Sequence, residues 1–235
     1  MLFEVGFQLS MASSKVVVVA AHPDDETLGM GGSIRKLSDS GIDVTVLFLA
    51  DGVTSRSMIR ESIASRRNAS LLALRLLGCT NVVFGDFPDN SLDTVPFLEI
   101  CQWIENQFKQ INPTTVFTHF PRDLNIDHRI VAEATTVASR PKADCSITEL
   151  YFFEVLSSTG WAFGSPAFDP KYFVNIESVF QAKIDALKCY EVEMDEFPGA
   201  RSLQAVEALA TTRGAFVGFS KSEAFEIGFI RSNDF

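Results

Sequence analysis

The sequence predicts a single Rossmann-like α/β domain with a doubly wound, mostly parallel sheet and helices on both of its faces. Over the first two-thirds of the chain, short apolar runs typical of buried strands alternate with longer segments of helical periodicity. This alternation is the pattern of βαβ units, whose strands are parallel and whose crossovers are right-handed. A chain of 235 residues with 46% hydrophobic residues can bury one such core without splitting into two domains.

The expected strands of this region are continuous apolar runs, the kind found in parallel sheets. They cover residues 15–20, 44–50, 81–84 and 114–119. Helical spacing predicts the intervening helices over residues 26–40, 57–77, 95–110 and 127–139. In the second of these helices, four apolar side chains are expected to face the core: Ile63, Leu71, Leu74 and Leu77.

After Pro141 the pattern is less regular. A further strand is expected over residues 147–156, followed by amphipathic helices over residues 176–190 and 202–215. Two connecting segments, residues 157–170 and 196–202, mix aromatic residues with Gly, Pro and Ser. Both are equally consistent with ordinary surface connections and with the rim of a substrate cleft.

Residues 1–14 are interpreted as an N-terminal extension of a domain that spans residues 15–235, because Met11 is as good a start as the first methionine. The first ten residues lack the basic start and the small-residue cleavage site of a signal peptide. There is no apolar run of 18 residues, so no transmembrane helix is expected. The four cysteines are scattered and are interpreted as buried thiols. We therefore expect a cytoplasmic protein.

The charge balance limits the class of partner. A formal net charge of -10, with basic residues clustered only in pairs such as Arg66 and Arg67, argues against nucleic acid or an anionic membrane. The expected partner is a small molecule, and a homo-oligomer remains open.

Three histidines lie where a doubly wound sheet binds its ligands. His22 follows the first strand, His119 ends the fourth strand, and His128 comes nine residues later. Strands one and four are neighbours at the topological switch point, where ligands bind at the carboxyl ends of the strands. Asp24 and Asp25 stand directly beside His22. Acids this close cost energy unless a cation lies among them, although any single histidine is more often a core residue.

His22 and Asp25 are three positions apart in a turn that enters a helix, so their side chains can lie on the same side. With His128 they would form a two-histidine, one-carboxylate site with an open position for water, the arrangement of catalytic zinc. The same ligands also suit Fe²⁺, Co²⁺ or Mn²⁺. Asp24 is expected to point away from the metal ligands, so it would not bind the metal but would lie near the metal-bound water. The alternative role for acids here is helix capping, which suits Glu26 or Thr27 better than the whole set.

The segments AHPDDETLGMGG (21–32) and HFPRDLNIDHR (119–129) resemble the two signature motifs of the PIG-L/LmbE-like family of zinc-dependent N-deacetylases. The resemblance runs from about residue 15 to 140. It implies removal of the acetyl group from a GlcNAc-type amino sugar, free or linked to a nucleotide, lipid or glycoside, in glycan or sugar-metabolite biosynthesis. Carried over by position, it implies His22, Asp25 and His128 as zinc ligands and Asp24 as general base.

Two places depart from the family pattern. Asn125 stands where many members have a histidine, and its amide can donate to an oxyanion but cannot shuttle a proton. His119 is therefore a further candidate for stabilising the oxyanion or protonating the leaving amine. The helix segment SRRNASLLALRLLG lacks the glutamate of the family's Arg-x-x-Glu, which leaves Arg66 and Arg67 as equal candidates for binding substrate. Asp123 in the second motif is another expected substrate residue.

Asp127 has two equally supported roles, since it could orient a ligand imidazole or cap the helix that it precedes. A reading from a different functional class is a non-catalytic metal- or nucleotide-binding module, prompted by GMGGS at residues 29–33. That segment lacks the GxGxxG order and comes late after the strand. A serine hydrolase is disfavoured because the chain has no GxSxG. A purely structural metal would have four protein ligands, whereas this motif supplies three.

Overall fold

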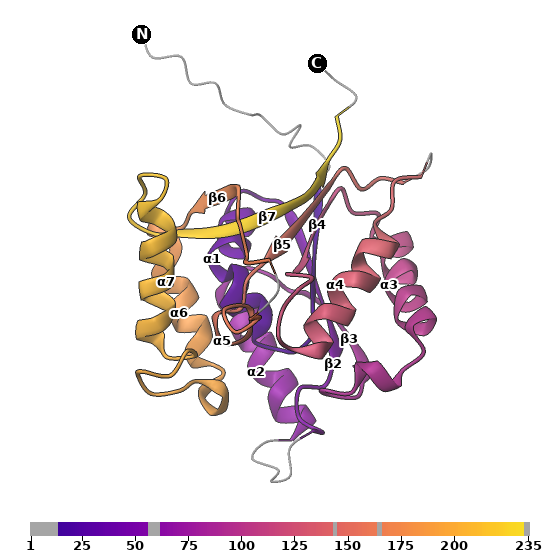
Figure 1. Cartoon of the computed structure of the whole chain (residues 1–235), viewed down its shortest axis with the longest axis horizontal. Coiled ribbons are helices and arrows are strands. Elements are labelled where there is room, and N and C mark those ends of the chain that lie inside the picture. The colour runs from indigo at the N-terminus through magenta and orange to yellow at the C-terminus, as the bar shows by residue number, and fades with distance from the viewer. Residues whose placement is uncertain (1–13, 56–61, 143–144, 164–165, 233–235) are drawn as a thin grey trace.

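The computed structural model (Figure 1) describes residues 14–55, 62–142, 145–163 and 166–232. Its strands form one sheet in the order β3-β2-β1-β4-β5-β7-β6. The strands are β1 Lys15–Ala20, β2 Asp43–Ala50, β3 Asn81–Phe87, β4 Thr115–His119, β5 Glu149–Phe153, β6 Tyr172–Asn175 and β7 Ser222–Ile230. β1 to β5 are parallel, and β7 runs antiparallel to both β5 and β6. The N-terminal extension expected for residues 1–14 lies outside the described residues, apart from Ser14.

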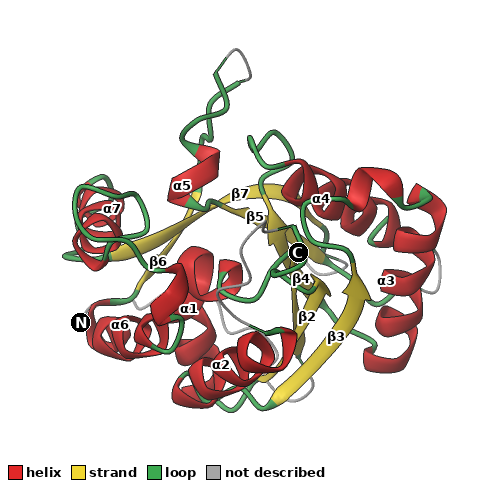
Figure 2. Cartoon of the chain, turned by 90° about the horizontal axis from the view of Figure 1, so that it is seen from below, coloured by secondary structure: helices red, strands yellow, loops and turns green. Residues whose placement is uncertain are grey.

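Helices cover both faces of this sheet. They are α1 Asp25–Asp39, α2 Ile63–Leu76, α3 Phe97–Ile111, α4 Ile126–Ala138, α5 Leu156–Thr159, α6 Phe180–Lys188 and α7 Leu203–Ala215, with 3₁₀ turns η1 Leu92–Thr94, η2 Glu177–Val179 and η3 Glu191–Glu193. Figure 2 shows α3 and α4 on one face of the sheet and α1, α2 and α6 on the other. Within the described residues, no helix is long and apolar enough to cross a membrane.

The core lies in two layers, one on each face of β1. Val16 and Val18 pack with the layer that contains α1, α2, α6 and α7, whereas Val17 and Val19 pack with the layer that contains α3 and α4. Successive strand side chains point to opposite faces, so a strand covered on both sides must be apolar throughout. The doubly wound sheet predicted from these continuous runs is confirmed.

The sequence interpretation of α2 was wrong about which side chains face the core. The helix begins at Ile63, after Ser62 accepts a hydrogen bond from the Ser65 N–H, and residues 56–61 lie outside the described part of the chain. Ile63 and Leu71 are 37% and 43% exposed, while Leu74 is fully buried as expected. The leucines are spread around more of the helix circumference than the neighbouring elements cover, so some of them face solvent. β6 and β7 were not predicted, because the half-exposed β7 carries charged residues among its apolar ones.

The glycine-rich segment after β1 serves packing. A Cβ on Gly29 would come within 2.4 Å of the Phe153 ring, and one on Gly32 within 2.7 Å of Ile176. Both close approaches require the absence of a side chain, because real Cβ contacts are longer. These glycines therefore let α1 lie directly against β5 and the segment after β6, which accounts for them without a phosphate ligand.

α1 also contains a break in its helical hydrogen bonding, and a residue of a buried ion pair accepts the main-chain N–H groups that the break leaves free. Met30 has a non-helical φ of -149°, which leaves main-chain N–H groups after it without helical partners. Glu223 of β7 accepts the N–H groups of Gly32 and Ser33 at 2.9 and 2.7 Å. Lys183 of α6 pairs with the same carboxylate at 2.6 Å, and both side chains are 4% exposed. The middle of α1 is thereby fixed to α6 and β7.

We expect Glu223→Ala to lower the free energy of unfolding by about 3–5 kcal/mol, because it leaves the Lys183 charge buried and unpaired. Asp169→Ala, which breaks an ion pair to Lys171 between side chains that are 73% and 66% exposed, is the matched control. It should change the free energy of unfolding by less than about 0.5 kcal/mol. Urea unfolding measures both, and equal losses would contradict the role given to Glu223.

Candidate active site

The turn that follows β1 is closed by His22 and Asp25. The His22 N–H donates to Asp25 Oδ2 at 2.9 Å, and the Asp25 N–H donates to the His22 carbonyl oxygen at 3.2 Å. Between them, Asp24 has a φ of 126°, a conformation rare for a residue with a side chain. Glu26 holds this turn from beneath by accepting the Asp24 N–H at 3.0 Å and the Tyr190 hydroxyl at 2.7 Å.

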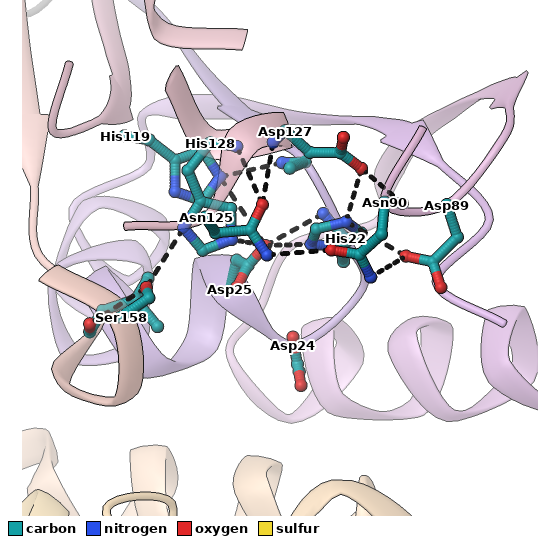
Figure 3. Close-up of polar contacts among 12 residues, drawn as sticks. His22, Asp24, Asp25, Asp89, Asn90, His119, Asn125, Asp127, His128 and Ser158 are labelled. Atoms are coloured by element: carbon teal, nitrogen blue, oxygen red, sulfur yellow. Dashed lines mark hydrogen bonds and ion pairs between the residues drawn. The ribbon is translucent and has the colours of Figure 1, made fainter. Parts of the chain in front are cut away.

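The structure brings the three expected metal ligands together (Figure 3). Asp25 Oδ2 lies 3.1 Å from His22 Nδ1 and 3.2 Å from His128 Nε2. His128 stands in the first turn of α4, which reaches this point because β4 pairs with β1. The three side chains can share one metal ion, and they are at most 6% exposed.

In each of the two expected ligand histidines, the ring nitrogen that faces away from Asp25 contacts a carboxylate. His22 Nε2 lies 3.0 Å from Asp127 Oδ2 and 3.2 Å from Asp89 Oδ1. His128 Nδ1 lies 3.2 Å from Asp123 Oδ1. A carboxylate behind the imidazole fixes its tautomer and orientation, as is usual for histidines that bind metals. Both imidazoles are thus held with the nitrogen nearest Asp25 available as a ligand.

Asp127 lies behind His22 rather than behind its sequence neighbour. Its Oδ2 also accepts the Asn90 N–H at 2.7 Å, and its Oδ1 accepts the Leu92 N–H at 3.1 Å. The capping role falls instead to Asn125, whose Oδ1 accepts the N–H of Asp127 at 2.8 Å. Of the two roles that the sequence left open for Asp127, its contacts fit the orientation of an imidazole.

Asp123 is not placed where a substrate could reach it. It is 2% exposed, and its Oδ2 accepts the hydroxyls of Ser158 at 3.0 Å and Thr159 at 2.5 Å while its Oδ1 faces His128. Because both oxygens are engaged, the substrate contact expected from the sequence does not agree with the structure. Asp123 instead connects α5, within the predicted rim segment 157–170, to His128.

His119 is also placed differently from the sequence expectation. It is fully buried, and its Nε2 accepts the Ala21 N–H at 2.8 Å. Its ring is stacked on His128 with centroids 3.9 Å apart. Burial and the neighbouring charge of His128 hold the pKa of His119 well below its usual value. A neutral imidazole whose Nε2 already accepts a hydrogen bond has no proton there to give to a leaving amine.

Asp24 lies to one side of the histidine cluster (Figure 3) and is held by two arginines. Its Oδ2 is 2.7 Å from Arg201 Nη1 and 3.1 Å from Arg66 Nη2, whereas its Oδ1 is buried without a hydrogen-bond partner. Arg66 is only 2% exposed, so its side chain is buried beside Asp24 and is not on a surface that a substrate could contact. Arg67 forms an ion pair with Asp86 outside this cluster.

Sequence reasoning missed Arg201 and Asp89. Arg201 lies in segment 196–202, which was singled out as a rim, but nothing in its spacing marked the arginine itself. Asp89 follows β3 in a loop with no histidine or cysteine, and its Oδ2 accepts the Ser55 hydroxyl. A link between Asp24 and a residue 177 positions away is visible only in the folded chain.

The electrostatics of the cluster favour a cation. Burial alone would lower the pKa of His22, but hydrogen bonds to Asp127, Asp25 and Asp89 outweigh it and raise that pKa well above its usual value. Burial alone would raise the pKa of Asp25, but the charge and hydrogen bond of His128 and the hydrogen bond of His22 lower it strongly. Each group is stabilised in its charged form, as expected where carboxylates surround a position that suits positive charge.

The donor set fits a divalent metal. Two imidazole nitrogens and a carboxylate oxygen are ligands of zinc and of similar divalent ions. Asp25 Oδ1 is buried and makes no hydrogen bond, and the only polar contact of His128 Nε2 among the described residues is with Asp25, so both atoms have capacity for a metal bond. His22, Asp89 and Asp127 form a second group with metal-site spacing. In that group Asp127 already accepts two main-chain hydrogen bonds, so we assign it to anchoring His22.

Comparison with known proteins gives the family. The family model described as PIG-L, GlcNAc-PI de-N-acetylase, matches residues 17–139, more than half of the 235-residue chain. The chain belongs to the PIG-L family. A curated relative, the diacetylchitobiose deacetylase of Thermococcus kodakarensis, is 30% identical over 196 residues, which cover 77% of this chain and 71% of the relative.

Two solved structures share the architecture of this chain. The N,N′-diacetylchitobiose deacetylase of Pyrococcus horikoshii aligns with a TM-score of 0.74 at 22% identity, over 92% of this chain and 84% of that chain. The 4-carboxy-2-hydroxymuconate hydratase of Pseudomonas putida aligns with a TM-score of 0.76 at 19% identity, over 94% and 99%. At these identities the likeness concerns the fold, which carries more than one chemistry.

We expect Asp123→Asn to weaken the affinity of the protein for a divalent metal about 10–100-fold, because His128 loses the carboxylate that orients its ring. Asp93→Asn, at an exposed acid of the same size in η1, should leave the affinity unchanged. Competition titration of zinc against a chelating dye measures the affinity, and circular dichroism checks the fold. An unchanged affinity in Asp123→Asn would show that this carboxylate does not support a ligand.

Proposed function

We propose that this PIG-L family member is a zinc-dependent N-deacetylase that hydrolyses the acetyl amide of a GlcNAc-type amino sugar. The observation that carries the proposal is the convergence of His22, Asp25 and His128 at one point, with carboxylates behind both imidazoles. Three protein ligands leave a coordination position for water or substrate, as catalytic zinc requires and structural zinc does not.

The metal and the protein have separate tasks in this proposal. Bound by His22, Asp25 and His128, a zinc ion would supply Lewis-acid polarisation of the acetyl carbonyl and would make a water molecule more acidic. The chain itself supplies the proton acceptor and the orientation of the ligands. Asp25, His22 and His128 would fix the position of the acetyl carbonyl of the substrate. Each of the three has a further polar contact that holds its side chain in place.

Asp24 is the general base. Its Oδ2 is occupied by Arg201 and Arg66, so its free Oδ1 is the atom that accepts the proton of the attacking water. Burial raises the pKa of Asp24, and Arg201 and Arg66 oppose that rise. A carboxylate whose pKa is moved toward neutrality is a more effective base. Protonated Asp24 then returns the proton to the leaving amine nitrogen, a step that Nε2 of His119 cannot perform because it accepts the Ala21 N–H.

Asn125 is proposed to help stabilise the oxyanion. Its side chain caps α4 through Oδ1, and one N–H of its amide donates to Asn90 Oδ1 at 3.2 Å. A primary amide carries two N–H donors, so the second can be directed at the carbonyl oxygen of the substrate. This contact is weaker than an imidazolium would provide, which leaves most of the charge stabilisation to the metal.

The substrate class follows from the relatives. The family description names a GlcNAc lipid and the Thermococcus relative is named for diacetylchitobiose, so an N-acetylglucosamine unit is the shared element. Whether the sugar is free or attached to a nucleotide, lipid or glycoside depends on the rim segments. The cytoplasmic location stays a prediction from the sequence, and whether the protein forms a homo-oligomer stays open.

Metal-reconstituted protein is expected to release a primary amine and acetate from at least one N-acetylglucosamine compound, and chelator-treated protein is not. A panel of free, nucleotide-linked, lipid-linked and glycoside-linked sugars, assayed with an amine-reactive dye, tests this directly. Hydration of an unsaturated carboxylic acid, the chemistry named for the Pseudomonas protein of like fold, serves as the competing assay. Hydration without any amine release would contradict the proposal.

We expect Asp24→Asn to retain its metal and its fold while its turnover falls about 10²–10⁴-fold, the usual value of a positioned general base. Asp25→Asn is the matched variant at the neighbouring position, and it should lose metal and activity together. Metal content and turnover are measured on the same samples. Normal turnover in Asp24→Asn would remove the role of base, and lost metal would make Asp24 a ligand instead.

A further inference from the structure

We infer that Arg201 is a positioning residue for the general base: it holds one oxygen of Asp24 so that the other stays free and aimed at the attacking water. The inference rests on the proposed deacetylase function and adds a residue from the C-terminal third of the chain, beyond residues 17–139 that match the family model. The juxtaposition that carries it is the contact of 2.7 Å between Arg201 Nη1 and Asp24 Oδ2.

Arg201 belongs to a group of four charged side chains, of which it is the most exposed. Its Nη1 also lies 3.3 Å from Glu193 Oε2, and Glu193 in turn pairs with Arg66, which reaches Asp24 from the other side at 3.1 Å. Asp24 and Glu193 are 1% and 6% exposed, so they need these partners to remain charged. Two arginines thus face Asp24, and removing Arg201 takes away the nearer of these two cations.

The main chain around Arg201 is fixed before any substrate arrives. Gly199 closes a turn in which its N–H donates to the Glu196 carbonyl oxygen at 2.8 Å and its own carbonyl oxygen accepts the Ser202 N–H at 3.0 Å. A Cβ on Gly199 would lie 2.5 Å from the side chain of Asp195, so this turn requires glycine. Ser202 then begins α7 by accepting the Ala205 N–H at 3.1 Å. Arg201 is therefore presented from a helix start and not from a loose loop.

A second anchor sets the direction of the guanidinium. Arg201 Nε donates to the Ser157 hydroxyl at 3.2 Å, and Ser157 belongs to α5, the helix whose Ser158 and Thr159 hold Asp123 behind His128. One end of α5 thus steadies a ligand imidazole and the other end steadies the base. The planar guanidinium makes bonds in two fixed directions, which a lysine ammonium does not.

The contacts of Arg201 restrict the orientation of the Asp24 carboxylate. A carboxylate that is held through Oδ2 alone by two donors cannot rotate to bring Oδ1 onto an arginine, so Oδ1 remains the proton acceptor. Loss of orientation at a reacting group costs rate more than binding, because the substrate contacts are unchanged. The effect of Arg201 should then be seen in kcat and should depend on Asp24.

The test compares Arg201→Ala, Arg201→Lys and a matched control in the metal-loaded enzyme. Arg213→Ala is the control, because Arg213 also pairs with a carboxylate at 2.7 Å and its side chain is 17% exposed against 24% for Arg201, yet it contacts Glu154 instead of Asp24. We expect Arg201→Ala to lose about 10–100-fold in kcat with KM changed less than about twofold and the metal retained. Arg201→Lys should keep part of this activity, and Arg213→Ala nearly all of it.

Two further measurements separate positioning from a structural or substrate-binding role. Added guanidinium ion should restore part of the activity of Arg201→Ala but none to Asp24→Asn. In the Asp24→Asn background, Arg201→Ala should cause less than about a twofold further loss, since the group that it positions is gone. An equal loss in both backgrounds, a raised KM with unchanged kcat, or lost metal would overturn the inference. Amine release absent in the wild-type enzyme would instead contradict the proposed function.

Discussion

Four nitrogen atoms surround one buried carboxylate oxygen, Oδ2 of Asp25, and the rest of the site depends on this arrangement. The main-chain N–H of His22 and the ring nitrogens of His22, His128 and His119 lie 2.9 to 3.6 Å from it. An oxygen in that position is stable only as a charged or metal-bound group, because burial without such partners would favour its neutral form. Asp127 and Asp89 lie behind the His22 ring and Asp123 lies behind the His128 ring, where they keep these two rings turned toward Asp25.

The fold supplies this arrangement through two constraints. The pairing of β1 with β4 places the ends of both strands together, so that the His22 turn meets the first turn of α4. The break in α1 near Met30 lets the first turn of that helix sit over the strand ends while its second half packs against α6. Glu223 of β7 and Lys183 of α6 stabilise the break by direct contacts to the main chain of α1. Residues outside the histidine cluster thus help to hold the helix that carries Asp25.

Much of this could be read from the sequence, because local periodicity and strand order decide it. The continuous apolar runs gave the parallel strands, and the switch point of such a sheet brings His22 and His128 together although they are about a hundred positions apart. The remaining contacts depend on tertiary packing that leaves no periodic signal. The sequence motif suggested a substrate contact for Asp123, but in the folded chain one of its carboxylate oxygens contacts His128 and the other accepts hydrogen bonds from α5. Arg66 lies too deep for a substrate, and nothing in the sequence around Arg201 indicates that its side chain reaches Asp24.

The central claim is that His22, Asp25 and His128 together hold one divalent ion. X-ray absorption spectroscopy of the zinc-loaded protein tests it most directly, because the method reports the ligand atoms around the metal itself. The account predicts a first shell of nitrogen and oxygen at about 2.0–2.2 Å, with the outer-shell scattering of two imidazoles and no sulfur. A shell with sulfur at about 2.3 Å, or one without imidazole scattering, would contradict it.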